Sequence, residues 1–485
     1  MAKSLTVNAF FKTLMSIVNI VFPLLTAPYV ARILSIDGYT EYNKAMSMIG
    51  WFSPFAVFGV YTYGMRTISQ IKNDREAVSK LFTQLFSFSV FTSVFVTTIF
   101  ILLILFVPAF HAYRGMYAII ASQLLFICFS TDWANEAFEN YGFILLKTFF
   151  CRLLYIVAVF IFVKNENDVV IFVLLSSTNI LINNFLTFLY SKIRIPFSHI
   201  TIKEITTLSK PLFIVFLLVN SGMLYTNFDK FMLTWFASKT NLTYYNVSQT
   251  IILAMINVTT SIVLVSIPRL SYLWANNLEN EYYDILKKTT KTFMAFHTPC
   301  CVGMACIAWE VIYYYSGMRY IEAGWSLFFF AIRHYFSAFD MILARQVLLA
   351  TGNEKVLTKI YYIGGIYNIL CKIILLFLNK LTPELCILTT ASADLLVIIL
   401  QYYNIKKLKI HFNLFTVGIF RYLFISFLFI PVILIIKHFV PFTNIITITQ
   451  RTLLSIITCS LIYGIFLIIS KDELIYTIIK KVKKS

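Results

Sequence analysis

The segment that decides the fold is residues 81–107, LFTQLFSFSVFTSVFVTTIFILLILFV, in which no residue carries a charge. The hydrocarbon core of a bilayer is about 30 Å thick and needs about 20 apolar residues of helix, so this segment alone is long enough to cross a membrane. Residues 10–34 and 45–63 form comparable apolar segments, and similar segments continue to residue 469. The sequence therefore predicts an all-α integral membrane protein.

We expect about fourteen transmembrane helices joined by short polar connections. The expected spans are residues 10–34, 45–63, 81–107, 115–136, 143–163, 169–190, 209–236, 244–267, 292–315, 323–350, 358–378, 384–404, 416–437 and 447–469. Hydrophobic residues make up 59% of the 485 positions, charged residues only 13%, and the mean hydropathy is +0.80. Such a composition leaves no room for a soluble domain of ordinary size.

The basic residues indicate topology rather than a nucleic-acid partner. The formal net charge is +18, but the lysines and arginines are spread along the chain and do not gather in one soluble region. With a cytoplasmic amino terminus, 25 of the 40 basic residues, Lys147 among them, fall in inside segments, and seven, including Lys437, fall outside. The positive-inside rule then places both termini in the cytoplasm.

No motif for an enzyme, a metal or a resident cofactor is found in the sequence. The eight cysteines lie in or beside apolar spans, and the six histidines lack ligand spacing, so we expect neither a disulfide framework nor a metal site. A phosphate-binding loop, a dinucleotide fingerprint and a zinc-protease motif are all missing. A transport cycle would therefore use a substrate gradient or couple to a proton or sodium gradient.

A weak internal repeat divides the chain into two halves. Arg66 follows the pair Tyr42-Asn43, and Arg269 follows the pair Tyr245-Asn246 at the same spacing, with an offset of 203 residues between the copies. The repeat predicts two pseudosymmetric six-helix lobes, at 1–208 and 209–405, followed by two extra helices and a basic tail at 406–485. Repeats of this kind are common in transporters, with the substrate site at the interface between them, although two matching motifs can also arise by chance.

Charged residues at membrane depth are costly and therefore become candidates for function. Arg32 follows Pro28 near the outer end of the first span. Its side chain either lines a cavity and holds an anionic headgroup or reaches the interface as an anchor. Pro28 would bend the helix, which suits a gating helix and also occurs in static bundles.

Five further charged residues interrupt later spans. Asp229 and Lys230 lie in the seventh span, where the carboxylate either binds a coupling cation or forms a structural ion pair. Arg333 and Asp340 lie two turns apart on the tenth span, so they predict one polar stripe. Asp394 lies in the twelfth span and is either a protonatable coupling group or a satisfied polar contact.

Arg66 and Arg269 end equivalent helices on the expected cytoplasmic side. Guanidinium groups bind phosphate oxygens in pairs, so the two arginines could capture a diphosphate at an inner opening. The positive-inside bias alone would also place arginines there.

Several ordered motifs resemble the polysaccharide repeat-unit flippases, the Wzx-like branch of the MOP transporter superfamily. The resemblance extends over most of the chain and rests on residues 28–34 with Gly38-Tyr39, residues 59–66 with Asn73-Asp74, Asp132-Trp133 with Glu139, residues 162–164 with Asn167-Asp168, Tyr225 with Asp229-Lys230, Tyr245-Asn246, residues 268–271, and Leu349, Thr351-Gly352 and Lys355. Two positions depart from the family pattern, because Thr40 and Ala137 stand where glycine is usual. These departures put the local backbone and the role of Glu139 in doubt.

The resemblance implies a flippase of the bacterial cytoplasmic membrane. It implies that an oligosaccharide linked to undecaprenyl diphosphate moves from the inner to the outer leaflet by alternating access of two lobes around a basic cavity. The polysaccharide polymerase and assembly machinery are expected partners. We expect Arg32, Arg66 and Arg269, with Lys230 and Arg333, to line the site for the diphosphate. Coupling or gating is expected of Asp229, Asp340, Asp394, Glu139 and Pro28.

Two other functions remain open. A small-molecule exporter of the related MATE branch would share the fold and use Asp229 or Asp394 as its coupling carboxylate. A membrane glycan polymerase would need a sizeable external loop or an acidic site, and the only short acidic pattern expected outside is Glu166-Asn167-Asp168. We interpret that tripeptide as a solvated loop.

Overall fold

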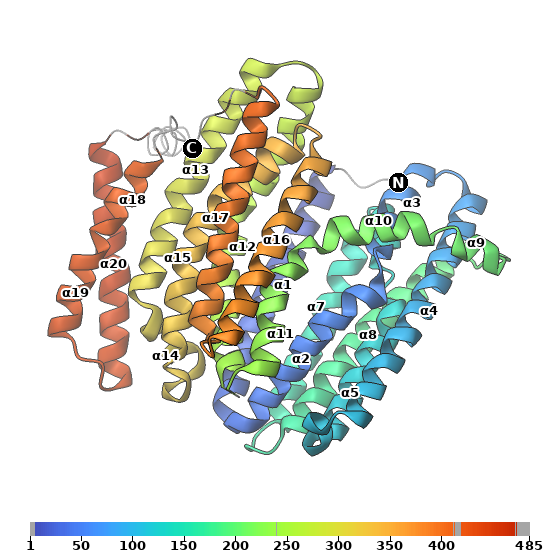
Figure 1. Ribbon diagram of the computed structural model, residues 1–485, viewed down its shortest axis with the longest axis horizontal. Helices are drawn as coiled ribbons and strands as arrows, with labels where there is room; N and C mark the ends of the chain where they lie inside the picture. Colours follow the sequence, from blue (N-terminus) through green and yellow to red (C-terminus); the bar gives the residue numbers. More distant parts are fainter. Residues whose placement is uncertain (1–4, 239, 411, 413–418, 471, 473–485) are drawn as a thin grey trace. The chain divides into compact units, whose positions relative to one another are not determined.

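Helices make up all the regular structure in the described part of the chain (Figure 1). The computed structural model describes residues 5–238, 240–410, 412, 419–470 and 472. No strand occurs among these residues, so the predicted all-α fold is confirmed. The chain divides into two compact units, Met1–Thr243 and Tyr244–Ser485.

The first unit contains eleven α-helices and three short 3₁₀ helices among its described residues. The α-helices are α1 (Leu5–Ile33), α2 (Ile36–Val57), α3 (Val60–Ile71), α4 (Arg75–Phe106), α5 (Arg114–Leu125), α6 (Asp132–Ala137), α7 (Tyr141–Phe162), α8 (Val169–Arg194), α9 (Ile202–Thr206), α10 (Ser209–Asn220) and α11 (Thr226–Phe236). The 3₁₀ helices are η1 (Pro108–Tyr113), η2 (Phe126–Phe129) and η3 (Ser221–Leu224).

The second unit is entered by α12, which begins just before the division between the units. Its α-helices are α12 (Asn241–Ala275), α13 (Glu279–Cys306), α14 (Ala308–Ser316), α15 (Ala323–Met341), α16 (Glu354–Phe377), α17 (Pro383–Lys407), α18 (Phe420–Phe427), α19 (Phe429–Phe439) and α20 (Ile445–Ile469). A 3₁₀ helix, η4 (Met318–Tyr320), precedes α15, and a π-helix, η5 (Ile342–Leu349), continues it.

Twelve helical segments of the described chain are long and apolar enough to cross a membrane, or thirteen if the bent pair α13–α14 counts as one span. The protein is therefore a multi-pass membrane protein. The number of about fourteen stays a prediction. α1, which contains the first expected span, includes Pro23 and Pro28 in its interior.

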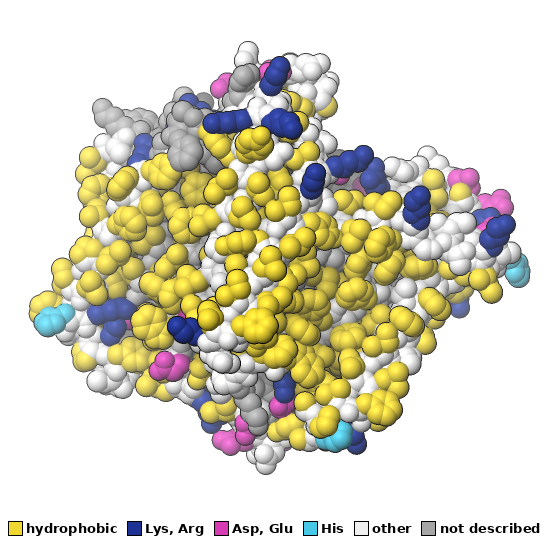
Figure 2. Space-filling model, in the orientation of Figure 1, with side chains coloured by type: hydrophobic (Ala, Val, Ile, Leu, Met, Phe, Trp, Pro, Cys, Tyr) yellow, Lys and Arg dark blue, Asp and Glu magenta, His cyan; other side chains and the backbone are white. Residues whose placement is uncertain are grey.

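On α4, large apolar side chains are exposed on the outer surface, and small polar side chains are buried on the inner one. Phe91, Phe95 and Phe106 are exposed, whereas Ser93 and Thr97 are buried. Hydrophobic side chains also cover most of the visible face along the helices in Figure 2, and basic side chains gather near α9 and α10. A helix whose outer surface is apolar and whose small polar residues face inward is suited to hydrocarbon surroundings.

A left-handed turn at Phe58 and Gly59 divides the expected second span into α2 and α3. Phe58 has φ of 43° and Gly59 has φ of 79°. A Cβ atom at position 59 would lie 2.8 Å from the carbonyl oxygen of Leu212 and 2.9 Å from the amide nitrogen of Phe216. Glycine is thus needed both for the backbone conformation and for the close approach of α10.

Further expected spans are interrupted as well. The seventh span, 209–236, consists of α10, η3 and α11, and the ninth bends by 76° between α13 and α14. The tenth ends in the π-helix η5. Broken helices and π-helices in membrane proteins often occur at functional sites.

The division between the units lies at Thr243 and Tyr244, after the sequence-based boundary at residue 208. It lies there because α10 packs on α3 and α11 packs on α2. The lobes of the repeat stay a prediction.

The two C-terminal helices are tied to the second unit by a buried carboxylate. Glu310 of α14 is fully buried, and its Oε1 lies 2.7 Å from Arg451 Nε of α20 and 3.4 Å from Lys437 Nζ of α19. Lys437 also donates a hydrogen bond to the carbonyl oxygen of Cys306 at 2.6 Å. Buried charges in a membrane need such partners, and the two cations that face Glu310 come from two different helices, α19 and α20.

Candidate functional site

The three arginines predicted to hold a diphosphate are all exposed. Arg32 lies in the last turn of α1 and Arg66 lies in α3, both in the first unit. Arg269 lies in α12 of the second unit. Pro28 is half-buried inside α1, next to Tyr29, whose hydroxyl donates a hydrogen bond to the carbonyl oxygen of Val163 at 2.8 Å.

Asp229 and Lys230 lie directly after the interruption of the seventh span. α11 is attached to α2, because the indole nitrogen of Trp51 donates to the carbonyl oxygen of Asn227 at 2.6 Å. Asp229 is fully buried and Lys230 is half-buried. The break therefore places two charged residues in the first turn of a helix that packs inside the unit.

The predicted polar stripe on α15 contacts α16 and α17. Nε of Arg333 lies 2.8 Å from Oδ2 of Asp394. Asp340, two turns further along, accepts hydrogen bonds from Gln401 at 2.6 Å and from the Tyr361 hydroxyl at 3.1 Å. The stripe thus consists of polar contacts between helices, and Arg333 itself is only 6% exposed.

Two of the motifs that resemble the flippases pack against each other in the first unit. The Tyr61 hydroxyl of α3 donates a 2.6 Å hydrogen bond to Glu136 of α6. A Cβ atom at Gly64 would lie 2.5 Å from the ring of Trp133. Residues 59–66 and 132–139 therefore form one structural element, which explains why both motifs carry small and aromatic residues.

The positions that depart from the family pattern do not need glycine here. Thr40 lies inside α2 and accepts a hydrogen bond from Thr243 at 3.0 Å. Ala137 is buried at the end of α6. The left-handed residue is Glu139 instead, with φ of 58° and an exposed side chain, so its carboxylate lies at the surface of the α6–α7 turn.

Lys147 belongs to a buried ionic cluster that sequence reasoning missed. It lies inside α7, 7% exposed, with its Nζ 3.0 Å from Oδ1 of Asp132 and in contact with the Thr187 hydroxyl. Thr187 also donates to Asp132 at 3.2 Å. The signal was present, since a lysine within a predicted span marks a candidate site. The sequence-based interpretation instead placed Lys147 among the basic residues of the cytoplasmic segments.

A basic pocket of about 580 Å³ lies at one end of the first unit. Lys72 and Arg75 line it from the α3–α4 turn, Asn140 from the α6–α7 turn, and Arg194 from the last turn of α8. The Arg194 guanidinium also stacks over the Tyr190 ring at 4.3 Å. Three cations and an amide around one hollow form an environment that attracts anions such as phosphate.

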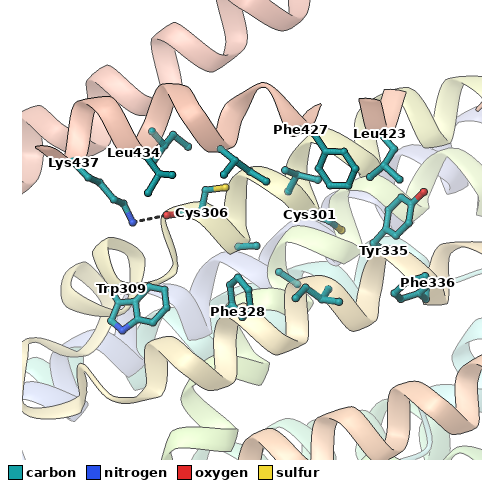
Figure 3. A pocket seen from close by; sticks show the side chains of 16 residues that line it. Cys301, Cys306, Trp309, Phe328, Tyr335, Phe336, Leu423, Phe427, Leu434 and Lys437 are labelled. Atoms are coloured by element: carbon teal, nitrogen blue, oxygen red, sulfur yellow. Dashed lines mark hydrogen bonds between the residues drawn. The ribbon is translucent and has the colours of Figure 1, made fainter. Parts of the chain in front are cut away.

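An apolar cavity of about 590 Å³ lies in the second unit between α13, α15 and the C-terminal helices α18 and α19. Figure 3 shows that Cys301, Phe328 and Phe427 point into it, and Lys437 lies at one end beside Trp309. The Lys437 ammonium is 5.8 Å from the centre of the Trp309 ring. The cavity is suited to hydrocarbon, with a positive charge at one end.

No group of three or more histidine, cysteine, aspartate or glutamate side chains could hold a metal ion among the described residues. The eight cysteines are free thiols, each buried or half-buried.

These features define a polytopic α-helical membrane protein whose units are held together internally by buried ion pairs and polar contacts. Residues 5–274 match the family described as polysaccharide biosynthesis protein. Because the match covers more than half of the chain, the protein belongs to this family.

The relatives and solved structures agree with this assignment. A putative O-antigen transporter from Shigella dysenteriae is 22% identical over 358 residues, which cover 73% of this chain and 88% of the relative. The lipid II flippase MurJ, in an inward closed conformation, has a TM-score of 0.68 at 15% identity and covers 95% of this chain and 99% of its own. The eukaryotic MATE transporter AtDTX14 has a TM-score of 0.52 at 12% identity, covering 86% and 98%. The match over residues 5–274 confirms that the resemblance to polysaccharide biosynthesis proteins is a family relationship. The solved structures show a shared fold, and the similar proteins are named as transporters or flippases rather than enzymes.

Proposed function

We propose that this protein is a flippase, without chemical turnover, for the lipid-linked repeat units of a cell-surface polysaccharide. It moves an oligosaccharide attached to undecaprenyl diphosphate from the inner to the outer leaflet of the bacterial cytoplasmic membrane by alternating access. The observation that carries the proposal is the family match of residues 5–274 on a multi-pass membrane fold. The similar proteins named as an O-antigen transporter and a lipid II flippase support it further.

The physical problem explains why such a protein is needed. The hydroxyl and diphosphate groups of the headgroup would lose their hydration in hydrocarbon, and each unreplaced hydrogen bond costs several kcal/mol on cyclohexane-type scales, about 4–8 kcal/mol. Polar and cationic side chains replace those bonds, while the lipid tail stays in apolar surroundings. Within the first unit, the basic pocket offers the cationic environment.

In this proposal, exposed cationic side chains bind the diphosphate of the substrate. Arg32, Arg66 and Arg269 are accessible, and guanidinium groups bind phosphate oxygens in pairs. Lys230 is half-buried and is a further candidate. Arg333 is buried and paired with Asp394, so in this proposal it acts on the conformational equilibrium rather than on the headgroup.

We assign coupling and gating to three acidic residues in helices and to two positions where the backbone can change direction. Asp229, Asp340 and Asp394 lie in the helices α11, α15 and α17, where binding of a proton or a sodium ion would change the balance between conformations. Pro28 and Glu139 lie in a proline-containing helix and in a left-handed turn, where the backbone can change direction. Both termini are placed in the cytoplasm by the positive-inside rule.

The experiment is depletion of the protein in its own cells, followed by measurement of lipid-linked oligosaccharide in each leaflet with a membrane-impermeant sugar-modifying enzyme. The expected result is that repeat units accumulate in the inner leaflet, out of reach of the enzyme, and return to the outer leaflet on re-expression. Unpolymerised units displayed normally outside would indicate a polymerase. Unchanged lipid-linked glycan would instead favour a small-molecule exporter.

A further inference from the structure

Lys372 lies in the interior of α16 with no exposed surface. Four oxygen atoms surround its Nζ: Oδ1 of Asn368 at 2.6 Å, Oγ1 of Thr389 at 2.6 Å, Oγ1 of Thr390 at 2.9 Å and the carbonyl oxygen of Cys386 at 2.9 Å. They come from two helices, α16 and α17, both in the second unit. We call these four oxygens the oxygen cage.

The hydroxyl groups of the oxygen cage are oriented as acceptors toward Lys372. The Thr389 hydroxyl lies 2.9 Å from the carbonyl oxygen of Leu385, and the Thr390 hydroxyl lies 3.0 Å from that of Cys386. Each hydroxyl has one proton. That proton is taken by one of these carbonyl oxygens or, for Thr390, by Oδ1 of Asn368 at 3.2 Å, so in either case the lone pairs of the hydroxyls remain for Nζ. A side-chain amide oxygen and a backbone carbonyl oxygen are acceptors by nature.

The surroundings therefore match the hydrogen-bonding pattern of an ammonium group. An ammonium group has three N–H donors and no acceptor, which matches a cage of acceptors. A neutral amine would direct a lone pair at an oxygen. Burial of a charge inside a membrane protein is costly unless hydrogen bonds replace its hydration, and the oxygen cage supplies that replacement.

The local sequence builds this cage at fixed helical spacing. Asn368 is one turn before Lys372 on α16, so both side chains lie on the same face. On the neighbouring helix, Thr382 caps the start of α17 by accepting from the amide of Leu385. The next turn then presents Cys386, Thr389 and Thr390 to α16. Carbonyl, amide and hydroxyl oxygens arranged around one point are the ligands with which proteins replace the water shell of a monovalent cation.

We propose that the second unit contains a monovalent-cation site whose resident cation is the protein's own Lys372 ammonium. A mobile coupling ion must enter and leave its site during each transport cycle. The Lys372 ammonium is tethered to the chain, so at this place the protein supplies the cation itself and takes no ion from solution. This inference concerns the cation site alone and does not depend on which substrate is transported.

The test is chemical rescue of the purified full-length protein, followed by its thermal unfolding. Lys372→Ala removes the ammonium and leaves space, whereas Lys372→Met fills most of the space without a charge. Each variant is heated in propylammonium chloride, potassium chloride, sodium chloride or choline chloride at equal ionic strength. Lys359→Met, an exposed lysine of the same helix, is the matched control.

We expect Lys372→Ala to unfold about 5 °C or more below the wild type. Propylammonium, and to a smaller extent a small inorganic cation, should recover at least half of that loss, whereas choline should not fit and should recover none. Lys372→Met should lose stability without being rescued, because no space remains. Equal stability of Lys372→Met and wild type, or a Lys372→Ala variant that no small cation stabilises more than choline, would overturn the proposal.

A second pair of variants keeps the lysine, in case its removal prevents folding. Thr390→Ser retains the hydroxyl oxygen of the oxygen cage, and Thr390→Val removes it at nearly constant shape. The proposal expects the valine variant to unfold several degrees below the serine variant. If the valine variant is as stable as the wild type, the cage does not hold the ammonium and the proposal is wrong.

Discussion

Arg333 and Asp394 form an ion pair of 2.8 Å inside the second unit. Seven residues further along the same two helices, Gln401 donates to Asp340 at 2.6 Å. α15 and α17 therefore make polar contacts at matching positions two turns apart, and this ladder fixes their register. A conformational change that slid one helix along the other would have to break both contacts.

Removing one member of this ion pair should cost more stability than removing both members. A single substitution leaves a buried charge without a partner. We expect Arg333→Met to lower the free energy of unfolding by about 3–5 kcal/mol, because it leaves the Asp394 carboxylate buried without its guanidinium. The double variant Arg333→Met/Asp394→Leu should recover most of that loss, as measured by unfolding of the purified protein. If the double variant is stable but does not translocate repeat units, the ion pair serves the transport cycle. Full activity of the stable double variant would assign it to stability alone.

The left-handed turn at Gly59 should not tolerate a side chain. Gly59→Ala would place a Cβ atom 2.8 Å from the carbonyl oxygen of Leu212 in a backbone conformation that costs about 1–3 kcal/mol for other residues. We expect a loss of roughly that size in thermal unfolding and increased proteolysis around α10. Gly50→Ala is the control, since a Cβ there meets nothing within 4 Å. Equal behaviour of the two variants would contradict the proposed close approach.

The buried carboxylate of Glu310 should hold the C-terminal helices in place. Glu310→Gln removes the charge that faces Arg451 and Lys437, which leaves two cations without their carboxylate. We expect a loss of about 3 kcal/mol and faster hydrogen exchange in α19 and α20. Glu322→Gln, at an exposed glutamate, should change neither quantity. Unchanged exchange in Glu310→Gln would show that apolar packing alone attaches these helices.

The basic pocket of the first unit should contribute to capture of the anionic headgroup. Each hydrogen bond to a charged group is worth about 1.5–3 kcal/mol, so Lys72→Gln, Arg75→Gln and Arg194→Gln should each lower translocation about tenfold at limiting substrate. The loss should shrink when lipid-linked substrate is in excess. Lys164→Gln, in the connection between α7 and α8, is the control. Normal transport by the variant with all three substitutions would show that this pocket takes no part in substrate translocation.

The α7–α8 connection should depend on an ionised Asp168. Its Oδ2 accepts hydrogen bonds from the amides of Lys164 at 2.8 Å and Asn165 at 2.7 Å, and these bonds lower the pKa of the carboxyl below its usual range. A carboxyl whose pKa is lowered by folding stabilises the folded loop at pH values above its pKa in the unfolded chain, about 3.9. This stabilisation is lost as the pH falls through the lower pKa of the folded protein.

Hydrogen exchange of the Lys164 and Asn165 amides measures this effect. We expect both amides to be protected in the wild type at pH 7 and still at pH 4, and to be less protected in Asp168→Asn at both pH values. Glu166→Gln provides the control for the removal of a neighbouring charge. Protection in Asp168→Asn equal to that of the wild type would show that the carboxylate does not close the loop.

The apolar segments determined the fold class without help from the structure. A segment such as residues 81–107 has no stable alternative to a membrane helix, and the exposed phenylalanines of α4 confirm its outer face. The polar stripe from Arg333 to Asp340 was also predictable, because seven residues of helix return to the same side. The motifs at residues 59–66 and 132–139 already indicated the polysaccharide biosynthesis family, which the match over residues 5–274 confirmed.

Only the tertiary structure decided which charges are paired. Lys147 and Asp132, or Glu310 and Arg451, are neighbours because different helices bring them together, and helix spacing within one segment contains no information about that. The same holds for Lys372, whose oxygen cage joins α16 to α17, and for the basic pocket, which joins three separate connections. Hydrophobicity is a property of each segment and can be read along the chain. Pairing of buried charges is a property of the packing between segments, and it is decided by the free energy of the assembled helices.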